Sequence, residues 1–318
     1  MAYQTGDTIL DDHYNGFAAD NSPNNINKIW GTGDGTYGYG QSNTITSVSA
    51  GGTVQASQWN TLLSRLQSIG DHQGTNITTP DSGQLVTGDP IAAILEISTD
   101  ITSIGNNRYN VAAANLTQTS NPNSVNRTFT GSWTTNTIHE VSFTFASSDA
   151  ARYFFNAGGK ITHVWNLSGH TSDDKANEWV DLFNTKAATS TISANADSLS
   201  GSGSPNTNLN EGFWSGSSDD SYTIHQKMFA DSSPYTSNYC QWEVKMTGAH
   251  GDNNGIGNVV TIKATARDDA ADSSDDAALD QVDGNLSSSW TFSKPNTNQL
   301  NNDAVGTITA AEVSQTQA

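Results

Sequence analysis

The sequence contains little cysteine, few basic residues and no long apolar run. Its single cysteine, Cys240, excludes an internal disulfide. An alternating, strand-like stretch surrounds it, which is typical of a small buried side chain; a catalytic thiol is the alternative, but no ordered His and Asn pattern accompanies it. No stretch approaches membrane-spanning length, and the first residues lack a secretory signal. We therefore expect synthesis in a cytosol, with any outside location reached by another route.

Basic residues are scarce, since 13 Lys and Arg stand against 32 Asp and Glu and give a formal net charge of −19. A surface of that sign repels phosphate backbones and anionic lipids. We therefore expect no nucleic-acid partner and no membrane partner. Because charged residues make up only 14% of the chain, the composition fits seawater better than brine.

The motifs of common enzymes and cofactor sites are also missing. No Gly-x-Ser-x-Gly elbow or P-loop is present, and the seven His residues show no zinc-binding spacing. The glycines of Gly31-Thr32-Gly33-Asp34-Gly35 predict turns, because no following helix or βαβ unit supports a nucleotide site. No pair of carboxylates stands out for glycoside hydrolysis. We expect no enzyme activity, no catalytic residues, no cofactor and no metal.

One acidic run leaves an alternative open. Its carboxylates could offer several oxygens to Ca²⁺, although EF-hand spacing and the glycine of that loop are missing. A solvated loop between two strands is the simpler interpretation. The residues concerned are Asp268, Asp269, Asp272, Asp275, Asp276 and Asp280.

The residues that are present favour β-structure. Thr and the aromatic residues suit strands, whereas the frequent Gly, Asn, Asp and Ser suit turns. Eight Trp provide apolar surface for a core, which argues against disorder. Residues 239–246 alternate between polar and apolar side chains with a period of two. Asp252-Asn253-Asn254-Gly255 then predicts a hairpin turn.

Periodicity and turn residues predict the elements in chain order. Helices are expected at 57–69, 89–105 and 172–187, and strands are expected at 128–133, 137–145, 151–155, 160–167, 222–229, 238–246, 259–267 and 284–292. We therefore predict a mainly β fold of β-sandwich-like antiparallel sheets, with two or three short α-helices and an extended N-terminal arm.

Three regions follow from this pattern. Residues 1–52 are rich in turn formers, which suit an extended arm or a set of small hairpins, and their aromatic residues favour an arm that docks on a partner. Residues 53–124 form a helical and irregular docking region, and residues 125–318 form a β-rich body. In the docking region, Gly70 is expected to end the first helix. The apolar stripe of that helix consists of Trp59, Leu62, Leu63, Leu66 and Ile69.

An aromatic run in the body is a further candidate for packing. Tyr153, Phe154 and Phe155 are consecutive, which predicts a strand covered on both faces. Gly158 and Gly159 then allow a sharp turn of the backbone.

Several segments resemble virion structural proteins of marine tailed phages, including those of cyanobacteria. The most specific is Ala151-Arg152-Tyr153-Phe154-Phe155-Asn156-Ala157-Gly158-Gly159-Lys160-Ile161. The others are Tyr37-Gly38-Tyr39-Gly40-Gln41, Ser57-Gln58-Trp59-Asn60-Thr61-Leu62, Asp71-His72-Gln73-Gly74-Thr75 and the stretches around 238–258 and 280–284.

The resemblance implies a non-enzymatic structural subunit of a virion, in several copies in the tail, neck or baseplate region. Its partners would be other copies of itself and other virion structural proteins. The assembly and packing candidates are Tyr37, Tyr39, Trp59, Leu62, Leu66, Tyr153, Phe154, Phe155, Gly158 and Gly159. The alternatives are a receptor- or glycan-binding tail fibre or adhesin that contacts host surface glycans, a capsid decoration protein and, least favoured, a polysaccharide depolymerase.

Overall fold

A computed structural model describes residues 11–19, 24–79, 94–204, 207–208, 212–215, 221–247, 257–270 and 281–318. Over these residues the protein is rich in sheet, with two antiparallel sheets and six α-helices, most of them short. The chain divides into two compact units. The first unit comprises 1–117, 152–159 and 294–306, and the second comprises 118–151, 160–293 and 307–318.

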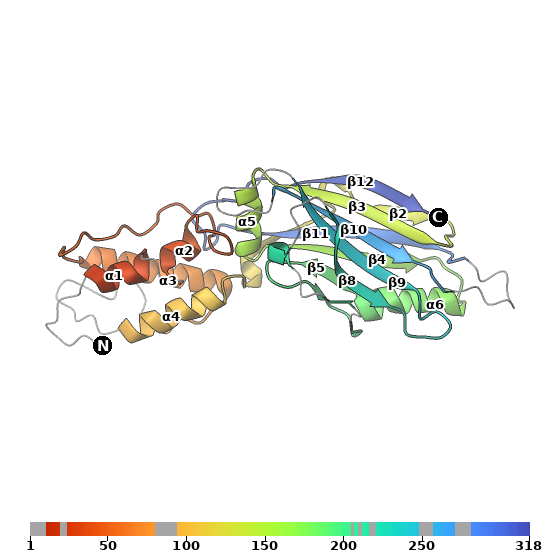
Figure 1. Ribbon diagram of the computed structural model, residues 1–318, viewed down its shortest axis with the longest axis horizontal. Helices are drawn as coiled ribbons and strands as arrows, with labels where there is room; N and C mark the ends of the chain where they lie inside the picture. Colours follow the sequence, from red (N-terminus) through yellow and green to blue (C-terminus); the bar gives the residue numbers. More distant parts are fainter. Residues whose placement is uncertain are drawn as a thin grey trace. The chain divides into compact units, whose positions relative to one another are not determined.

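The second unit holds both sheets (Figure 1). Sheet I has the strand order β1 (Leu116–Ser120), β11 (Asn285–Pro295), β4 (Lys160–Ser168), β5 (Thr189–Ile192) and β6 (Ser198–Leu199), and β2 (Arg127–Thr130) also pairs with β11. Sheet II has the order β12 (Thr309–Gln317), β3 (Asn136–Thr144), β10 (Val259–Arg267), β9 (Tyr239–Thr247), β8 (Thr223–Phe229) and β7 (Thr207–Asn208).

The long strands form because every second side chain is apolar or otherwise suited to burial. In β3 and β4 the buried and half-exposed residues alternate almost without interruption. The buried side chains of the two sheets meet one another, since the rings of Phe143 in sheet II and Trp290 in sheet I lie 5.9 Å apart. The strands predicted at 137–145, 160–167, 222–229, 238–246, 259–267 and 284–292 are confirmed.

Other predicted elements differ in extent or lie outside the described residues. The strand expected at 128–133 is shorter, because the backbone leaves β2 after Thr130 and reaches Gly131 at a φ of 92°. The hairpin turn at 252–255 and the start of the helix predicted at 89–105 fall outside the described residues, which begin for that helix with α4 (Ile94–Asn106).

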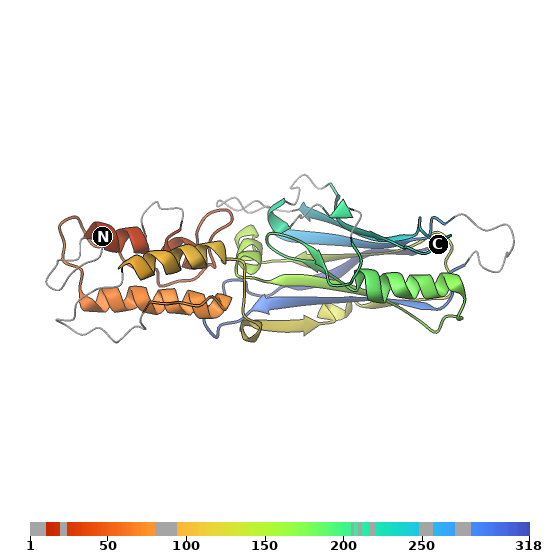
Figure 2. The same cartoon turned by 90° about the horizontal axis from the view of Figure 1, so that it is seen from below.

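The helix predicted at 172–187 is confirmed as α6 (Asp174–Asp181), followed by the π-helix η3 (Leu182–Ala187). Asp173 caps it, because its carboxylate accepts a 2.7 Å hydrogen bond from the Ala176 amide. Trp179 and Phe183 on its inner side are almost fully buried, at 1% exposure each. Figure 2 shows α6 beside the strands of the second unit.

The first unit is built on helices. Helix α3 (Ala56–Gln73) is the longest of the described helices, and its predicted stripe is buried, with Trp59, Leu62, Leu66 and Ile69 at 1% exposure or less. Figures 1 and 2 both show α4 running beside it. The short elements of the described chain are completed by η1 (Ala113–Asn115), η2 (Pro122–Ser124) and η4 (Phe213–Ser215).

The sequence suggested that Gly70 ends helix α3, but the structure shows that it does not. The helix continues to Gln73, and Gly74 terminates it in the left-handed region at a φ of 72°. Gly70 serves a different purpose, because a Cβ there would lie 2.3 Å from the Ile77 side chain. The glycine therefore allows the chain that follows the helix to fold back closely against it.

The prediction of an extended arm over residues 1–52 is wrong for the part of this region that the structure describes. This part contains α1 (Asp11–Ala18) and α2 (Ile26–Trp30), and Asn25 caps α2 through a 2.7 Å bond from the Lys28 amide. Both helices pack an apolar face against the core that contains α3. The rings of Tyr14 on α1 and Trp59 on α3 lie 6.3 Å apart. Residues 1–52 therefore share one core with the helices of 53–124 instead of preceding them as an arm.

The prediction of a strand at 151–155 is also wrong, because this segment belongs to helix α5 (Ser148–Asn156). Ser147 starts the helix by accepting a 3.0 Å hydrogen bond from the Ala150 amide, and Asp149 adds a favourable charge in the first turn. Local capping thus overrides the strand preference of three consecutive aromatic residues. Residues 152–159, with 294–306, belong to the first unit, so 125–318 is not one continuous body.

The burial of Trp59 makes its contribution to stability measurable. We expect Trp59→Ala to lower the free energy of unfolding of the first unit by about 3–5 kcal/mol, because a large cavity replaces the indole. Urea unfolding followed by circular dichroism measures this change, with the exposed position Ser64→Ala on the same helix as a control. An effect no larger than that of the control would show that Trp59 is not a core residue.

Candidate functional site

Part of the resemblance comes together in the first unit, namely the segments at 37–41, 71–75 and 152–159, whereas the stretches around 238–258 and 280–284 belong to the second unit. The glycine-rich loop 31–41, the end of α3 at His72 and Gln73, and residues 152–159 form one hydrogen-bonded cluster, called here the motif junction. Sequence reasoning singled out these segments separately, but no periodicity in the chain indicated that they touch.

Arg152 and Asn156 lie one helical turn apart on α5 and both reach the glycine-rich loop. The Arg152 guanidinium is fully buried and donates to the carbonyl oxygens of Tyr37 at 2.5 Å and Thr32 at 2.7 Å. The Asn156 side-chain amide donates to the carbonyls of Gly35 at 3.2 Å and Gly38 at 3.3 Å. The two side chains therefore satisfy carbonyl groups that a turn-rich loop leaves without helix or sheet partners.

The end of α3 completes the junction. Gln73 donates to the Tyr39 hydroxyl at 2.8 Å, and that hydroxyl donates to the Arg108 carbonyl at 2.7 Å. The Nε2 atom of His72 lies 3.0 Å from the Ala157 carbonyl, so this nitrogen must carry the proton. Burial lowers the pKa of His72 to about 4, which keeps the ring neutral at neutral pH.

The glycines of the junction permit close contacts. A Cβ on Gly40 would lie 2.4 Å from the Tyr153 ring, and one on Gly158 would lie 2.6 Å from Val111. Both residues have positive φ, at 70° and 85°, so the predicted turn at Gly158 and Gly159 is confirmed.

The structure places all ten assembly and packing candidates in the first unit. Tyr37 is partly exposed, and its ring receives the cations of Lys28 and Arg108 at 4.5 and 4.6 Å. The others are buried, with Tyr153 the most exposed of those measured, at 9%. They are Tyr39, Trp59, Leu62, Leu66, Tyr153, Phe154, Phe155, Gly158 and Gly159. This arrangement orders a loop and builds a core.

The Arg152 contacts predict that the stability of the first unit depends strongly on the planar shape of the guanidinium group. We expect Arg152→Lys to destabilise the first unit by about 2–3 kcal/mol, because one ammonium cannot serve carbonyls that a planar fork reaches together. The control is Arg65→Lys, whose half-exposed cation lies over the Trp30 ring and should change stability by less than about 1 kcal/mol. Equal effects of the two variants in urea unfolding would contradict the role assigned to Arg152.

The second unit contains a constellation that sequence spacing could not reveal. Ser288 on β11 lies 2.7 Å from Nδ1 of His139 on β3, and Nε2 of the same ring is 3.3 Å from a carboxylate oxygen of Glu312 on β12. Nε2 of His163 on β4 lies 2.7 Å from the same serine oxygen. A serine, a histidine and an acid in contact are the components of a nucleophilic triad.

Burial argues against catalysis at this cluster. Ser288 and His139 are at 0% exposure and His163 is at 1%, so a substrate carbonyl has no path to the serine oxygen in this conformation. Two imidazoles also hold that oxygen at the same distance, whereas a triad serine needs one base and an open side. The cluster therefore fixes the contact between the two sheets.

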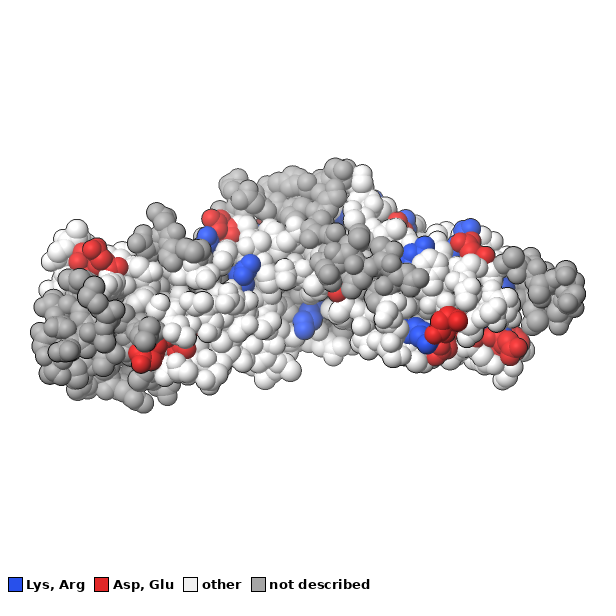
Figure 3. Space-filling view, turned by 60° about the horizontal axis from the view of Figure 1, so that its bottom comes forward, with Lys and Arg blue, Asp and Glu red and all other residues white. Residues whose placement is uncertain are grey.

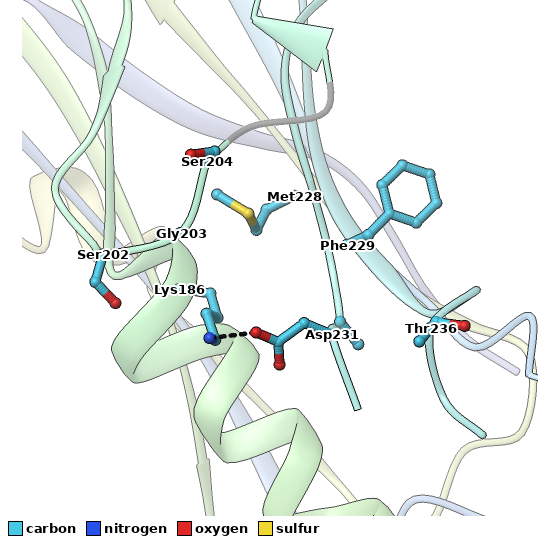
Figure 4. Close-up of a pocket in the computed structure, with 9 residues that line it drawn as sticks. Lys186, Ser202, Gly203, Ser204, Met228, Phe229, Asp231 and Thr236 are labelled. Atoms are coloured by element: carbon cyan, nitrogen blue, oxygen red, sulfur yellow. Dashed lines mark hydrogen bonds and ion pairs between the residues drawn. The ribbon is translucent and has the colours of Figure 1, made fainter. Parts of the chain in front are cut away.

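An open pocket lies at the end of η3 (Figure 4). It has a volume of about 450 Å³, and its lining includes Ser202, Ser204, Met228 and Thr236. The ammonium group of Lys186 forms an ion pair with Asp231, drawn as the dashed line in Figure 4. The two charges pair with each other, and the rest of the lining includes hydroxyl groups, the Met228 thioether and the apolar residues Phe229 and Ala230.

Carboxylates gather near this pocket and at the start of the acidic run. Oxygens of Glu178, Asp181 and Asp231 lie within 4.8 Å of one another, and Lys186 contacts the last two. In the acidic run, Asp268 pairs with Lys175 at 2.6 Å and Asp269 with Arg267 at 2.7 Å. The other four carboxylates of the run lie outside the described residues.

Charge is dispersed on the face shown in Figure 3. Acidic and basic side chains form small separate groups there, and most of the coloured surface is neither acidic nor basic. Among the residues coloured in this view, no continuous basic patch of the kind that binds phosphate backbones is present.

Cys240 is fully buried in β9, and burial raises the pKa of its thiol well above the usual range. We expect iodoacetamide to leave it unmodified in the native protein and to alkylate it fully in urea, because both access and thiolate formation require opening of the sheet. An introduced exposed thiol, Ser289→Cys, is the control and should react at once under native conditions. Rapid native labelling of Cys240, measured by mass spectrometry, would contradict its placement in the core.

Comparison with known proteins returned no relatives: no protein-family model, curated protein or solved structure matches the chain. Among the described helices, none is both long and apolar enough to cross a membrane. The functional conclusion therefore rests on the residues and geometry described above.

Proposed function

We propose that the chain is a non-enzymatic structural subunit of a tailed-phage virion, present in several copies in the tail, neck or baseplate region. The observation that supports the proposal most is the set of hydrogen bonds from the Arg152 and Asn156 side chains to carbonyl oxygens of the glycine-rich loop. The most specific resembling segment, 151–161, supplies the residues that hold the glycine-rich loop of the first unit, so this part of the resemblance concerns architecture.

The second unit supports the same proposal. We infer that sheets I and II are the two layers of a β-sandwich-like body, because buried side chains of both sheets interlock at Phe143, Trp290, His163 and Trp242. Rigid bodies of this kind suit a subunit that keeps its shape through assembly. The buried serine and histidines are committed to this packing and not to a substrate.

The proposal predicts where the protein is found. In purified particles of the phage that encodes it, peptides of this chain should be detected at several copies per particle by quantitative mass spectrometry. Gold-labelled antibody against the chain should mark the tail, neck or baseplate in electron micrographs. The isolated chain should release no reducing sugar from host envelope.

The possible results separate the alternatives. Absence from purified particles would overturn the proposal. Labelling over the whole capsid would favour a decoration protein, and labelling at fibre tips together with binding to host glycans would favour a receptor-binding role. Sugar release that is lost on replacing single carboxylates would show an enzyme.

A further inference from the structure

Hydrogen-bond donors fix the proton positions in the buried cluster between the sheets. The indole N–H of a tryptophan can only donate a hydrogen bond. Nε1 of Trp242 lies 3.0 Å from Nδ1 of His163, and Nε1 of Trp290 lies 3.1 Å from Nδ1 of His139. Both Nδ1 atoms must therefore be unprotonated acceptors, and each neutral ring carries its proton on Nε2.

The remaining contacts then have only one consistent direction. His163 donates from Nε2 to the Ser288 oxygen, and the Ser288 hydroxyl donates to Nδ1 of His139, each over 2.7 Å, so this hydroxyl and the Trp290 indole share the single lone pair of that nitrogen. Nε2 of His139 lies 3.3 Å from a Glu312 carboxylate oxygen but forms no hydrogen bond with it, and that carboxylate accepts from Arg127 at 2.9 and 3.0 Å. A directed chain thus runs from Trp242 through His163 and Ser288 to His139, which also accepts from Trp290.

This chain joins the two sheets more than once. Trp242 and His139 belong to sheet II, whereas His163, Ser288 and Trp290 belong to sheet I. Three of its hydrogen bonds therefore cross from one sheet to the other: Trp242 to His163, Ser288 to His139 and Trp290 to His139.

Protonation is incompatible with this arrangement. A second proton on either ring would have to sit on Nδ1, where it would face an indole N–H about 3 Å away. The serine hydroxyl can turn, but the indole has no acceptor to offer. We propose that the Trp242–His163–Ser288–His139 chain is an acid-sensitive lock that holds the two sheets together only while both imidazoles are neutral.

The charged groups around the rings are compatible with this behaviour. Burial is the largest influence and lowers the pKa of both imidazoles. Glu312 acts in the opposite direction on His139, while Arg127 lowers its pKa further, and His139 lowers that of His163. Because the unfolded chain has the higher histidine pKa, near 6.5, it binds more protons as the pH falls. The contribution of the lock is therefore complete above about pH 6.5 and is lost as the pH falls below it.

Hydrogen exchange of the full chain, with rates corrected for pH, tests the lock. From pH 7 to pH 5 we expect protection of peptides from β3, β4, β9 and β11 to fall in the wild type. The double variant His139→Gln and His163→Gln should lose this pH dependence, because an amide accepts and donates without titrating in this range. The control His72→Gln changes a buried histidine of the first unit and should leave the response of the second unit intact.

Two results would overturn the lock: unchanged protection in the wild type, or the same fall in the double variant. A second measurement covers a double variant that does not fold. Long-range ¹H–¹⁵N spectra of the wild-type imidazoles at pH 7 should show both rings protonated at Nε2, and a proton on Nδ1 of either ring would refute the directed chain. Neither experiment depends on the proposed place in a particle.

Discussion

The structure depends on one constraint, which is that removing a polar group from water costs free energy unless the group finds a partner. In the first unit this constraint applies to the glycine-rich loop. Its turns leave backbone carbonyl groups without helix or sheet partners inside the fold. The fork of Arg152 and the amide of Asn156 meet those carbonyls. In the second unit, indole and imidazole nitrogens meet each other between two sheets. The stacking of elements follows from these pairings as much as from apolar burial.

The same constraint separates structural from catalytic chemistry. Ser288, His139 and Glu312 show the atom types of a nucleophilic triad at hydrogen-bonding distances. What they lack is access to solvent and an unoccupied side of the serine oxygen. A satisfied and buried network stabilises one arrangement of the sheets, whereas a catalytic network needs a group whose partner is the substrate. Residue types alone do not distinguish the two.

Local patterns in the sequence were sufficient for the long strands and for the apolar stripe of α3, because period and turn chemistry act over a few residues. They failed where a local signal competed with another. Tyr153, Phe154 and Phe155 favour a strand, but the Ser147 cap and the reach of Arg152 and Asn156 favour a helix. The inter-sheet cluster could not be predicted at all. His139 and Ser288 are brought together only by folding. The spacing of residues along the chain gives no information about a contact between positions so far apart.

A resemblance carried by Arg152, Asn156 and the glycines of the loop is, in physical terms, a resemblance in folding requirements. An arginine buried against loop carbonyls is useful only if the loop keeps its turns, and the loop keeps them only where glycine permits close approach. These residues therefore depend on one another and would be retained together for architectural reasons alone. Any function of the protein that involves partners must then be sought on its surfaces and in its assembly, since its most distinctive residues are occupied in holding the chain together.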